Sequence, residues 1–142
     1  MKIENEAIRT LLRRAPVAVD PQMTLRAVAQ ILAEESIGAV VVRRERPLGT
    51  PHSYTIGVVS ERDISHAVAR GMDPDTTRAA DVMTAELADA EPDETILRVA
   101  TRMMANEVRH LPVNEGEELI GVISERDVLR ALVQALHDQS KV

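Results

Sequence analysis

A polar four-residue sequence, Ser-Glu-Arg-Asp, occurs twice in the chain and is its strongest candidate for binding chemistry. The copies run from Ser60 to Asp63 and from Ser124 to Asp127, and they end the longer phrases GVVSERD and GVISERD. The two phrases lie 64 positions apart, and self-similarity at a fixed spacing indicates a repeat architecture. We therefore expect the function of the chain to depend on one structural unit that is used twice.

The motif has a purely structural interpretation. A serine followed three residues later by an acid is a capping box, which satisfies backbone N–H groups at the start of a helix. This interpretation alone would account for both copies. It leaves room for a second role, because Ser60 can cap through its own oxygen and still donate its hydroxyl proton outward. The glycine that opens each phrase, Gly57 or Gly121, would let a ligand come close to the backbone.

The arginine in each copy favours a binding role. Arg62 and Arg126 fall in the first helical turn, where the helix dipole disfavours a cation. A bound phosphate would explain them, because free N–H groups and a guanidinium both bind phosphate. The neighbouring carboxylates of Asp63 and Asp127 could accept hydrogen bonds from a vicinal diol, as acids do for ribose in other nucleotide folds. A phosphate site beside a diol acceptor predicts a nucleotide ligand.

The repeat extends well beyond the motif. Thr24 and Thr95 are expected helix N-caps, and the apolar residues after them follow the spacing of a buried helix face. The two faces match at an offset of 71 and comprise Leu25, Val28, Ala29 and Leu32 in the first repeat and Ile96, Val99, Ala100 and Met103 in the second. Each repeat is therefore predicted to have the order β-α-β-β-α.

The same patterns predict the individual elements. In the first repeat we expect strands at 17–19, 39–42 and 56–59, a hairpin loop at 43–55, and helices that begin at Thr24 and Ser60. In the second we expect strands at 87–90, 108–113 and 119–123, a tight turn at 114–118, and helices from Thr95 and at 125–137. Short helices are expected within 1–14 and 79–83. The domain prediction is repeat 1 at 10–71, a connector at 72–84 and repeat 2 at 85–137. The fold class is α/β (α+β), with the two repeats packed as one pseudo-two-fold symmetric domain.

The composition limits the classes of partner. At 44% apolar and 28% charged residues, the chain is typical of a soluble globular protein. A net charge of −6, a single tyrosine and no other aromatic residue argue against nucleic acid, which requires a basic face and stacking platforms. The longest apolar run is too short to span a membrane, and the absence of cysteine excludes disulfides and Cys-based zinc sites. We expect a cytoplasmic protein that binds neither nucleic acid nor membrane.

Over residues 10–136 the sequence resembles a pair of cystathionine-β-synthase (CBS) domains, the tandem called a Bateman module. The resemblance rests on Asp-Val-Met-Thr at 81–84, the helix starts Pro21/Thr24 and Pro92/Thr95, His-Leu-Pro-Val at 110–113, and the doubled GV(V/I)SERD. It implies adenosine-containing ligands in clefts between the repeats, with the motif serine and aspartate contacting phosphate and ribose. It also implies dimers of modules, and most members of the family regulate another activity without catalysing a reaction.

These arguments together give the expected ligand-binding residues. The set for the second repeat is Ser124, Arg126, Asp127, His110, Leu111, Pro112 and Ala90, and the set for the first is Ser60, Arg62, Asp63, Val19, Ala39 and Val40. The first repeat departs from the family pattern, because Gly-Ala-Val-Val at 38–41 replaces Arg-His-Leu-Pro at 109–112 and Leu-Leu-Arg-Arg at 11–14 replaces the 81–84 sequence. The second site is therefore the better match.

The leading hypothesis is a stand-alone regulatory module that binds an adenine nucleotide (AMP, ADP, ATP, NADH or S-adenosylmethionine), with or without Mg²⁺, and signals to a separate effector protein. No catalytic residues, no metal site and no required cofactor are expected. His52, His66 and His137 are interpreted as surface or packing residues, and His110 is the exception because it precedes the strand that should flank a ligand. A homodimer is predicted through an apolar stripe formed by Leu129, Leu132, Val133 and Leu136. The alternative is a structural dimerisation module whose clefts stay empty.

Overall fold

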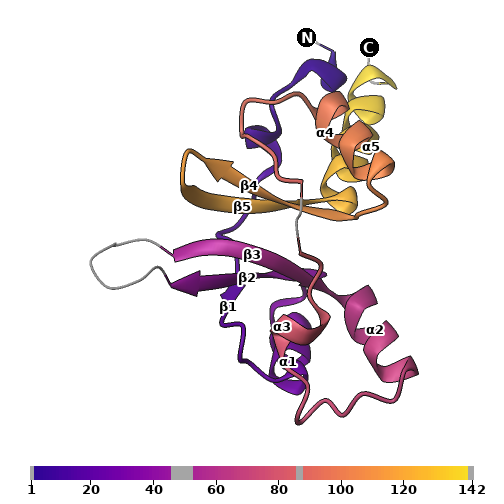
Figure 1. Cartoon of the computed structure of the whole chain (residues 1–142). Helices are drawn as coiled ribbons and strands as arrows, with labels where there is room; N and C mark the ends of the chain where they lie inside the picture. Colours follow the sequence, from indigo (N-terminus) through magenta and orange to yellow (C-terminus); the bar gives the residue numbers. More distant parts are fainter. Residues whose placement is uncertain (1, 46–52, 86–87, 141–142) are drawn as a thin grey trace. The chain divides into compact units, whose positions relative to one another are not determined.

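The computed structural model describes residues 2–45, 53–85 and 88–140 (Figure 1). The chain divides into two compact units, and one of them combines residues from both ends of the chain. The first-repeat unit is Pro16–Leu87, and the second-repeat unit combines Met1–Ala15 with Ala88–Val142. Each unit contains one repeat together with a segment that lies outside that repeat in the sequence.

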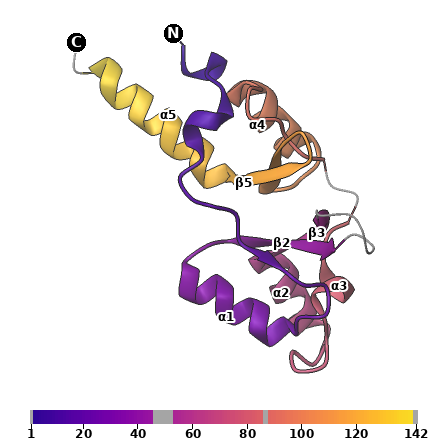
Figure 2. The same ribbon diagram turned by 90° about the vertical axis from the view of Figure 1, so that its left-hand side faces the viewer.

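The first-repeat unit is a three-stranded sheet with helices on one face (Figures 1 and 2). Strand β1 (Ala18–Val19) pairs parallel to β2 (Ala39–Glu45), which pairs antiparallel to β3 (Ser53–Ser60). The helices are α1 (Leu25–Glu35), α2 (Glu61–Ala69) and the short α3 (Ala79–Val82). The unit therefore has the predicted order β-α-β-β-α, followed by one extra helix.

Local chemistry explains helix α1. Its N-cap is Thr24, whose Oγ1 accepts a hydrogen bond from the Ala27 N–H at 3.2 Å. The helix ends at Ser36, which adopts a left-handed conformation with φ of 54°. Its buried face packs against the inward side chains of the sheet in a core of Val19, Val28, Leu32, Val40, Val42, Val59 and Ala79. The apolar face predicted from the spacing is thus the face that is buried.

The second-repeat unit repeats this plan with a smaller sheet. Strand β4 (His110–Glu115) pairs antiparallel to β5 (Glu118–Ser124), and helices α4 (Ile96–Ala105) and α5 (Glu125–Ser140) pack on the hairpin. The counterpart of β1 is a single parallel bridge between Ala90 and Val113. The hairpin turn contains Gly116 at φ of +62°, as the tight turn requires. The core comprises Ile8, Ala90, Ile96, Val99, Met103, Leu111, Val113, Ile123 and Val128.

Several predicted elements differ in the structure, among them the strand expected at 87–90, of whose described residues only Ala90 forms a bridge. The helix expected within 1–14 is instead a pair of 3₁₀ helices, η1 (Ile3–Asn5) and η2 (Ile8–Leu11). The physical reason is that the N–H groups of Ile8 and Arg9 donate to the carbonyls of Glu94 and Pro92, so they are not available for an α-helix. The hairpin loop predicted at 43–55 is shorter, because β2 extends to Glu45 and β3 begins at Ser53. Within the predicted loop, residues 46–52 (with His52) lie outside the described part of the chain, as does Leu87 of the predicted strand 87–90.

The extra segment in each unit is a lead-in segment, a name we use for residues 6–13 and 77–84. Each precedes one repeat in the sequence and packs with the other. The N–H of Ile8 donates to Glu94 O at 2.9 Å, and 71 positions along the chain the N–H of Ala79 donates to Met23 O at 2.8 Å. Most of the predicted connector therefore forms a built-in part of the first-repeat unit.

Candidate ligand-binding site

The first copy of the motif forms a complete capping box at the start of α2. The backbone N–H of Ser60 donates to Asp63 Oδ2 at 2.8 Å, and the backbone N–H of Asp63 donates to Ser60 Oγ at 3.2 Å. The Ser60 hydroxyl also donates to Asp63 Oδ2, at 3.0 Å. The structural interpretation of the motif is confirmed here, and the expected outward donation by Ser60 is wrong because its proton is directed to Asp63.

The second copy forms the same pair of bonds at the start of α5. The Ser124 N–H donates to Asp127 Oδ2 at 2.8 Å, and the Asp127 N–H donates to Ser124 Oγ at 3.1 Å. In both copies the aspartate thus uses one carboxylate oxygen, Oδ2, for the cap. This arrangement fixes the position of the other oxygen, Oδ1, at the surface end of the strand-to-helix junction.

Oδ1 has only weak contacts in both copies. At Asp63 it accepts from Thr84 Oγ1 at 3.5 Å, and at Asp127 it accepts from Arg130 Nη1 at 3.4 Å. Both distances are long for hydrogen bonds, and an ionised carboxylate has about four acceptor sites. Each aspartate can therefore cap its helix and still accept hydrogen bonds from a ligand hydroxyl.

The two motif arginines are available for an anion. Arg62 and Arg126 are exposed, and neither makes an ion pair or hydrogen bond with another residue in the described part of the chain. Each follows a glutamate and precedes an aspartate. A cation at this position has no stabilising partner within its own helix turn, as the sequence suggested.

The strands bring some of the other predicted site residues next to the motif. His110 lies opposite Ser124 in the β4–β5 hairpin, and Ala39 lies opposite Ser60 in the β2–β3 hairpin. In each unit the helix also bonds back to the residue that precedes the hairpin. The N–H of Glu61, the first residue of α2, donates to Gly38 O, and the N–H of Glu125, the first residue of α5, donates to Arg109 O, both at 2.9 Å. The junction of strand and helix is thus the same in the two units.

Other predicted site residues belong to the hydrophobic cores. Val19 and Val40 lie in the core of the first-repeat unit, and Ala90 and Leu111 lie in that of the second. Pro112 is buried, and its carbonyl accepts a hydrogen bond from the Ala90 N–H at 2.9 Å. The core side chains are already in contact with protein on their inward faces, so any contact that these residues make with a ligand would come mainly from their backbone.

The motif glycines serve the lead-in segments. A Cβ on Gly57 would lie 2.7 Å from Met83 Sδ and 2.9 Å from the Thr84 carbonyl oxygen. A Cβ on Gly121 would lie 2.9 Å from Leu12 Cδ2. The prediction that these glycines make room for a ligand is therefore wrong, because a lead-in side chain fills the space in both units.

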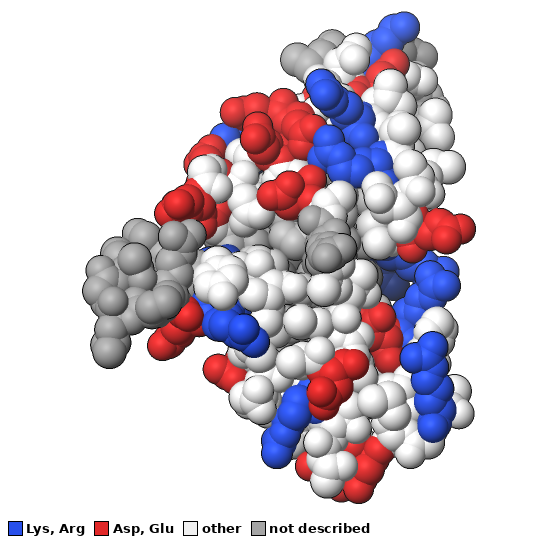
Figure 3. Space-filling model, viewed as in Figure 1, with Lys and Arg blue, Asp and Glu red and all other residues white. Residues whose placement is uncertain are grey.

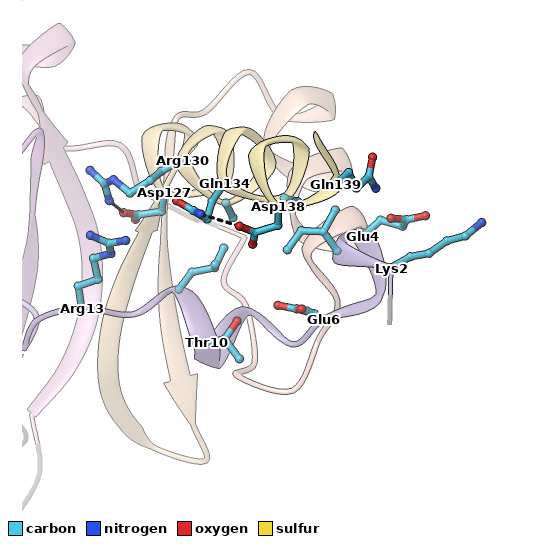
Figure 4. Close-up of a pocket in the computed structure, with 14 residues that line it drawn as sticks. Lys2, Glu4, Glu6, Thr10, Arg13, Asp127, Arg130, Gln134, Asp138 and Gln139 are labelled. Carbon is cyan, nitrogen blue, oxygen red and sulfur yellow. Dashed lines mark hydrogen bonds and ion pairs between the residues drawn. The ribbon is translucent and has the colours of Figure 1, made fainter. Parts of the chain in front are cut away.

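The lead-in segments also contribute polar residues that the sequence analysis missed. Thr84 contacts Asp63 in the first-repeat unit, and Arg13 points toward Asp127 and Arg130 in the second (Figure 4). Arg13, Asp127 and Arg130 lie at one end of an open groove between the N-terminal segment and α5, with a volume of about 1090 Å³. The offset of 71 that aligns the helix faces also aligns Arg13 with Thr84, and this signal could have identified them.

Acidic side chains dominate another part of the second-repeat unit. They gather over the segment before α4 and over the β4–β5 hairpin (red, upper left in Figure 3). The exposed acidic residues of these two segments include Glu91, Asp93, Glu115, Glu117 and Glu118. Arg9 pairs with Asp93 at 3.3 Å and also with Glu115, whose hydrogen bond raises the pKa of the Arg9 guanidinium. A surface of this charge repels a polyanion.

Neither a membrane span nor a metal cluster is found in the residues that the structure describes. No helix among them has the length and apolar content needed to cross a membrane. Residues 2–45, 53–85 and 88–140 contain no group of three His, Asp or Glu side chains placed to hold a metal ion. A solved structure of Hypoxic Response Protein I is described with two coordinated zinc ions; it is 26% identical, covers 87% of this chain and 97% of its own, and has a TM-score of 0.71.

Comparison with known proteins agrees with the repeat structure. The chain is 31% identical over 105 residues to the mitochondrial CBS domain-containing protein CBSX3 of Arabidopsis thaliana, covering 72% of this chain but only 49% of that protein. It is 27% identical to Hypoxic response protein 1 of Mycobacterium tuberculosis, over 87% of this chain and 83% of that protein. The chain thus spans about half the length of the Arabidopsis relative.

Solved structures share the whole fold. A CBS-domain protein from Agrobacterium tumefaciens is 28% identical with a TM-score of 0.79, covering 92% of this chain and 96% of its own. The CBS domain family itself matches two segments, residues 8–70 and 79–134. These segments correspond to the two repeats, each extended to include the lead-in segment that precedes it. The chain therefore belongs to the CBS domain family and carries a tandem pair of CBS domains.

Proposed function

We propose that this protein is a non-enzymatic regulatory module that binds an adenosine-containing ligand at its motif aspartates and signals to a separate effector protein. One observation carries the proposal. In both units the aspartate keeps Oδ1 for further hydrogen bonds while Oδ2 holds the helix cap. A fixed carboxylate oxygen with free acceptor capacity suits the vicinal hydroxyls of a ribose.

A related structure supports the ligand class. The CBS domain pair of protein MJ0100 was solved in complex with 5′-methylthioadenosine and S-adenosyl-L-methionine, and it resembles this chain with a TM-score of 0.77 at 20% identity. At that identity the likeness extends to the fold alone. The proposal for this chain therefore depends on its own two aspartates and on the arginines beside them.

The test is a calorimetric titration with adenosine, AMP, ATP, NADH and S-adenosylmethionine. The informative variant is Asp127→Asn, because the amide oxygen can keep the cap to the Ser124 N–H while an NH₂ group replaces the acceptor Oδ1. We expect adenosine affinity at that site to fall by about tenfold or more, the effect of losing a charged acceptor.

The matched control is Thr95→Ala, which removes the hydroxyl that caps α4 and leaves both motif aspartates and serines unchanged. We expect it to lower thermal stability and to leave affinity nearly unchanged. If wild-type protein binds none of these ligands, or if both variants bind equally well, the proposed ligand role of the aspartates is wrong.

A second function, dimerisation, is favoured by the exposed helix face of the second-repeat unit. This apolar face consists of Leu97, Met104, Leu129, Leu132, Val133 and Leu136, of which Met104 is 77% and Leu136 65% exposed. At the equivalent positions 26, 33, 65, 68, 69 and 72 the first-repeat unit has Arg, Ala, Ser, Val, Ala and Met, so only Val68 and Met72 match the large apolar side chains of this face. Because most of the equivalent positions carry small or polar residues, the repeat plan does not require this apolar surface, and we expect a partner to cover it.

We propose a second copy of the chain as that partner. The residues recur at helical spacing on the adjacent helices α4 and α5, so a two-fold axis would pack like against like and bury all six. A solved structure of the same fold, a CBS-CP12 protein, is described as hexameric. Sedimentation of Leu132→Glu, with Val68→Glu at the equivalent exposed position of α2 as control, tests this assignment. We expect only the first variant to be monomeric; a monomeric wild type would overturn the assignment.

A further inference from the structure

Two arginines from different segments converge on Asp127 in the second-repeat unit. Arg130 comes from the second turn of α5, and its Nη1 lies 3.4 Å from Asp127 Oδ1. Arg13 comes from the lead-in segment and points toward the same carboxylate from the opposite side of the groove (Figure 4). Two guanidinium groups therefore face one carboxylate, and the local charge is positive in a protein whose net charge is −6.

Neither Arg13 nor Arg130 makes a contact that contributes much to the stability of the fold. The Arg130 side chain is 41% exposed and its single ion pair is a long i,i+3 contact, a type that contributes about 0.5 kcal/mol or less. Arg13 is exposed and has no ion pair or hydrogen bond with any residue that the structure describes. The lead-in segment is held by the neighbouring residue Leu12, which fits against Gly121. Packing therefore does not explain an arginine at position 13.

The first-repeat unit has the same fold without arginines at the positions equivalent to Arg13 and Arg130. Thr84 occupies the position equivalent to Arg13, and His66 occupies the position equivalent to Arg130. The Thr84 hydroxyl reaches Asp63 Oδ1 at 3.5 Å, so a neutral group stands where the second unit has a cation. The same aspartate thus lies in two different electrostatic environments.

We infer that Arg13 and Arg130 form an anion subsite beside Asp127, which binds the phosphate groups of a nucleotide whose ribose is held by that aspartate. This inference rests on the proposed function and adds selectivity to it. A guanidinium binds phosphate bidentately, and two of them outweigh the repulsion from the single carboxylate. The second-repeat unit therefore selects phosphorylated nucleotides, and the first accepts ligands without phosphate at its equivalent position.

Other charged groups along the groove support this position for the anion. Glu4, Glu6 and Asp138 lie toward its far end together with Lys2 (Figure 4). Acidic groups are in excess at that end, so an anion is favoured only near the two arginines. Arg126, in the first turn of α5, adds a third positive charge to the same end of the helix.

The experiment is a calorimetric titration of the full chain with adenosine, ATP and inorganic tripolyphosphate. The variants Arg13→Thr and Arg130→His install the residues of the first-repeat unit, and Thr84→Arg makes the reverse change. Arg44→Thr, in an exposed position of β2, is the control for loss of one positive charge. Arg13→Lys keeps the charge and removes the bidentate geometry.

We expect Arg13→Thr and Arg130→His each to weaken ATP binding by about tenfold or more and to change adenosine binding by less than about threefold. Thr84→Arg should strengthen ATP binding at the other site, and Arg44→Thr should change neither. Tripolyphosphate should bind to wild type and lose affinity in Arg13→Thr. Added salt should reduce the difference between ATP and adenosine.

Two results would overturn the inference in different ways. If adenosine and ATP bind to wild type and both variants lose them equally, the arginines are not a phosphate subsite, although the proposed function stands. If neither ligand binds to wild type, the proposed function fails, and the anion subsite is then judged by tripolyphosphate alone. Tripolyphosphate affinity that is absent, or equal in wild type and Arg13→Thr, rejects the subsite in either case.

Discussion

The two repeats have different residue pairs at the equivalent positions beside helices α1 and α4. In the second-repeat unit Glu94 precedes α4 and is bound by Arg102 on the helix, with Arg102 Nη1 2.8 Å from Glu94 Oε2. Hydrogen bonds from Arg102 lower the pKa of Glu94 to about 2. The equivalent residues of the first-repeat unit are Met23 and Ile31, which pack against its hydrophobic core.

The difference shows which part of this arrangement the fold requires. Helices α1 and α4 both begin at a threonine cap and bury the same face. The residue pair at the equivalent positions is apolar beside α1 and ionic beside α4. An apolar pair can replace a partly buried ion pair at little cost in stability, whereas removal of one ionic partner is costly. The ion pair therefore gives the second-repeat unit a sensitivity to acid that the first lacks.

The largest difference between the units should appear at the motif glycines. Gly57→Ala should lower the free energy of unfolding by about 2–3 kcal/mol, because the new methyl group meets both the Met83 side chain and the fixed Thr84 carbonyl. Gly121→Ala should cost about 1 kcal/mol, because it meets only the flexible end of Leu12. Urea denaturation of both variants measures this difference. Equal costs would mean that the lead-in segments are held equally loosely in the two units.

Replacement of the Glu94–Arg102 ion pair by the apolar residues of the first repeat tests whether the fold requires the ion pair. Arg102→Met alone should cost about 2 kcal/mol, because it removes the short ion pair of the partly buried Glu94 carboxylate and leaves its long contact with Arg98, at 3.8 Å. The double variant Glu94→Met/Arg102→Ile should recover to within about 1 kcal/mol of wild type. Denaturation at neutral pH tests both. A double variant no more stable than Arg102→Met would mean that the surroundings of the pair also differ between the units.

Acid should destabilise the second-repeat unit first. The pKa of Glu94 is lower in the folded protein, so its contribution is complete above pH 4.5 and is lost as the pH falls from 4.5 toward about 2. We expect a loss of at most about 2 kcal/mol, since the pair is partly solvated. Hydrogen exchange of amides in α1 and α4 at pH 6 and pH 3 separates the two units. The Glu94→Met/Arg102→Ile variant should remove the excess loss in α4; if it remains, other carboxylates are responsible.

The smallest effect should come from the caps, where the units are alike. Ser60→Ala and Ser124→Ala should each lower the free energy of unfolding by about 1 kcal/mol. Ser60→Ala should cost slightly more, because the Ser60 hydroxyl also donates to Asp63. Thermal denaturation of both variants side by side checks this. A cost at only one site would show that the other helix start is held by its lead-in segment and not by the cap.

Sequence reasoning identified the parts of the fold that depend on local pattern. The offset of 71 located the buried faces of α1 and α4, and the spacing of Ser60 and Asp63 predicted the capping box. It did not find the exchange of lead-in segments, because residues 6–13 pair with a segment more than 80 positions away. The role of Arg13 was missed because the sequence analysis aligned residues 11–14 with 81–84, an offset of 70 that pairs Arg13 with Met83 and not with Thr84.

The exchange of lead-in segments has a consequence for how the chain is made. During synthesis the first repeat emerges from the ribosome preceded by residues 6–13, which do not belong to it, and it lacks residues 77–84, which do. Its unit can be completed only once the start of the second repeat has been translated, while the N-terminal segment waits for residue 96 to provide its partner. Contacts between residues so distant in sequence slow folding. They also make the folding of each unit depend on a segment that adjoins the other repeat in the sequence. A fragment cut at the boundary between the repeats would therefore lack a piece of both units.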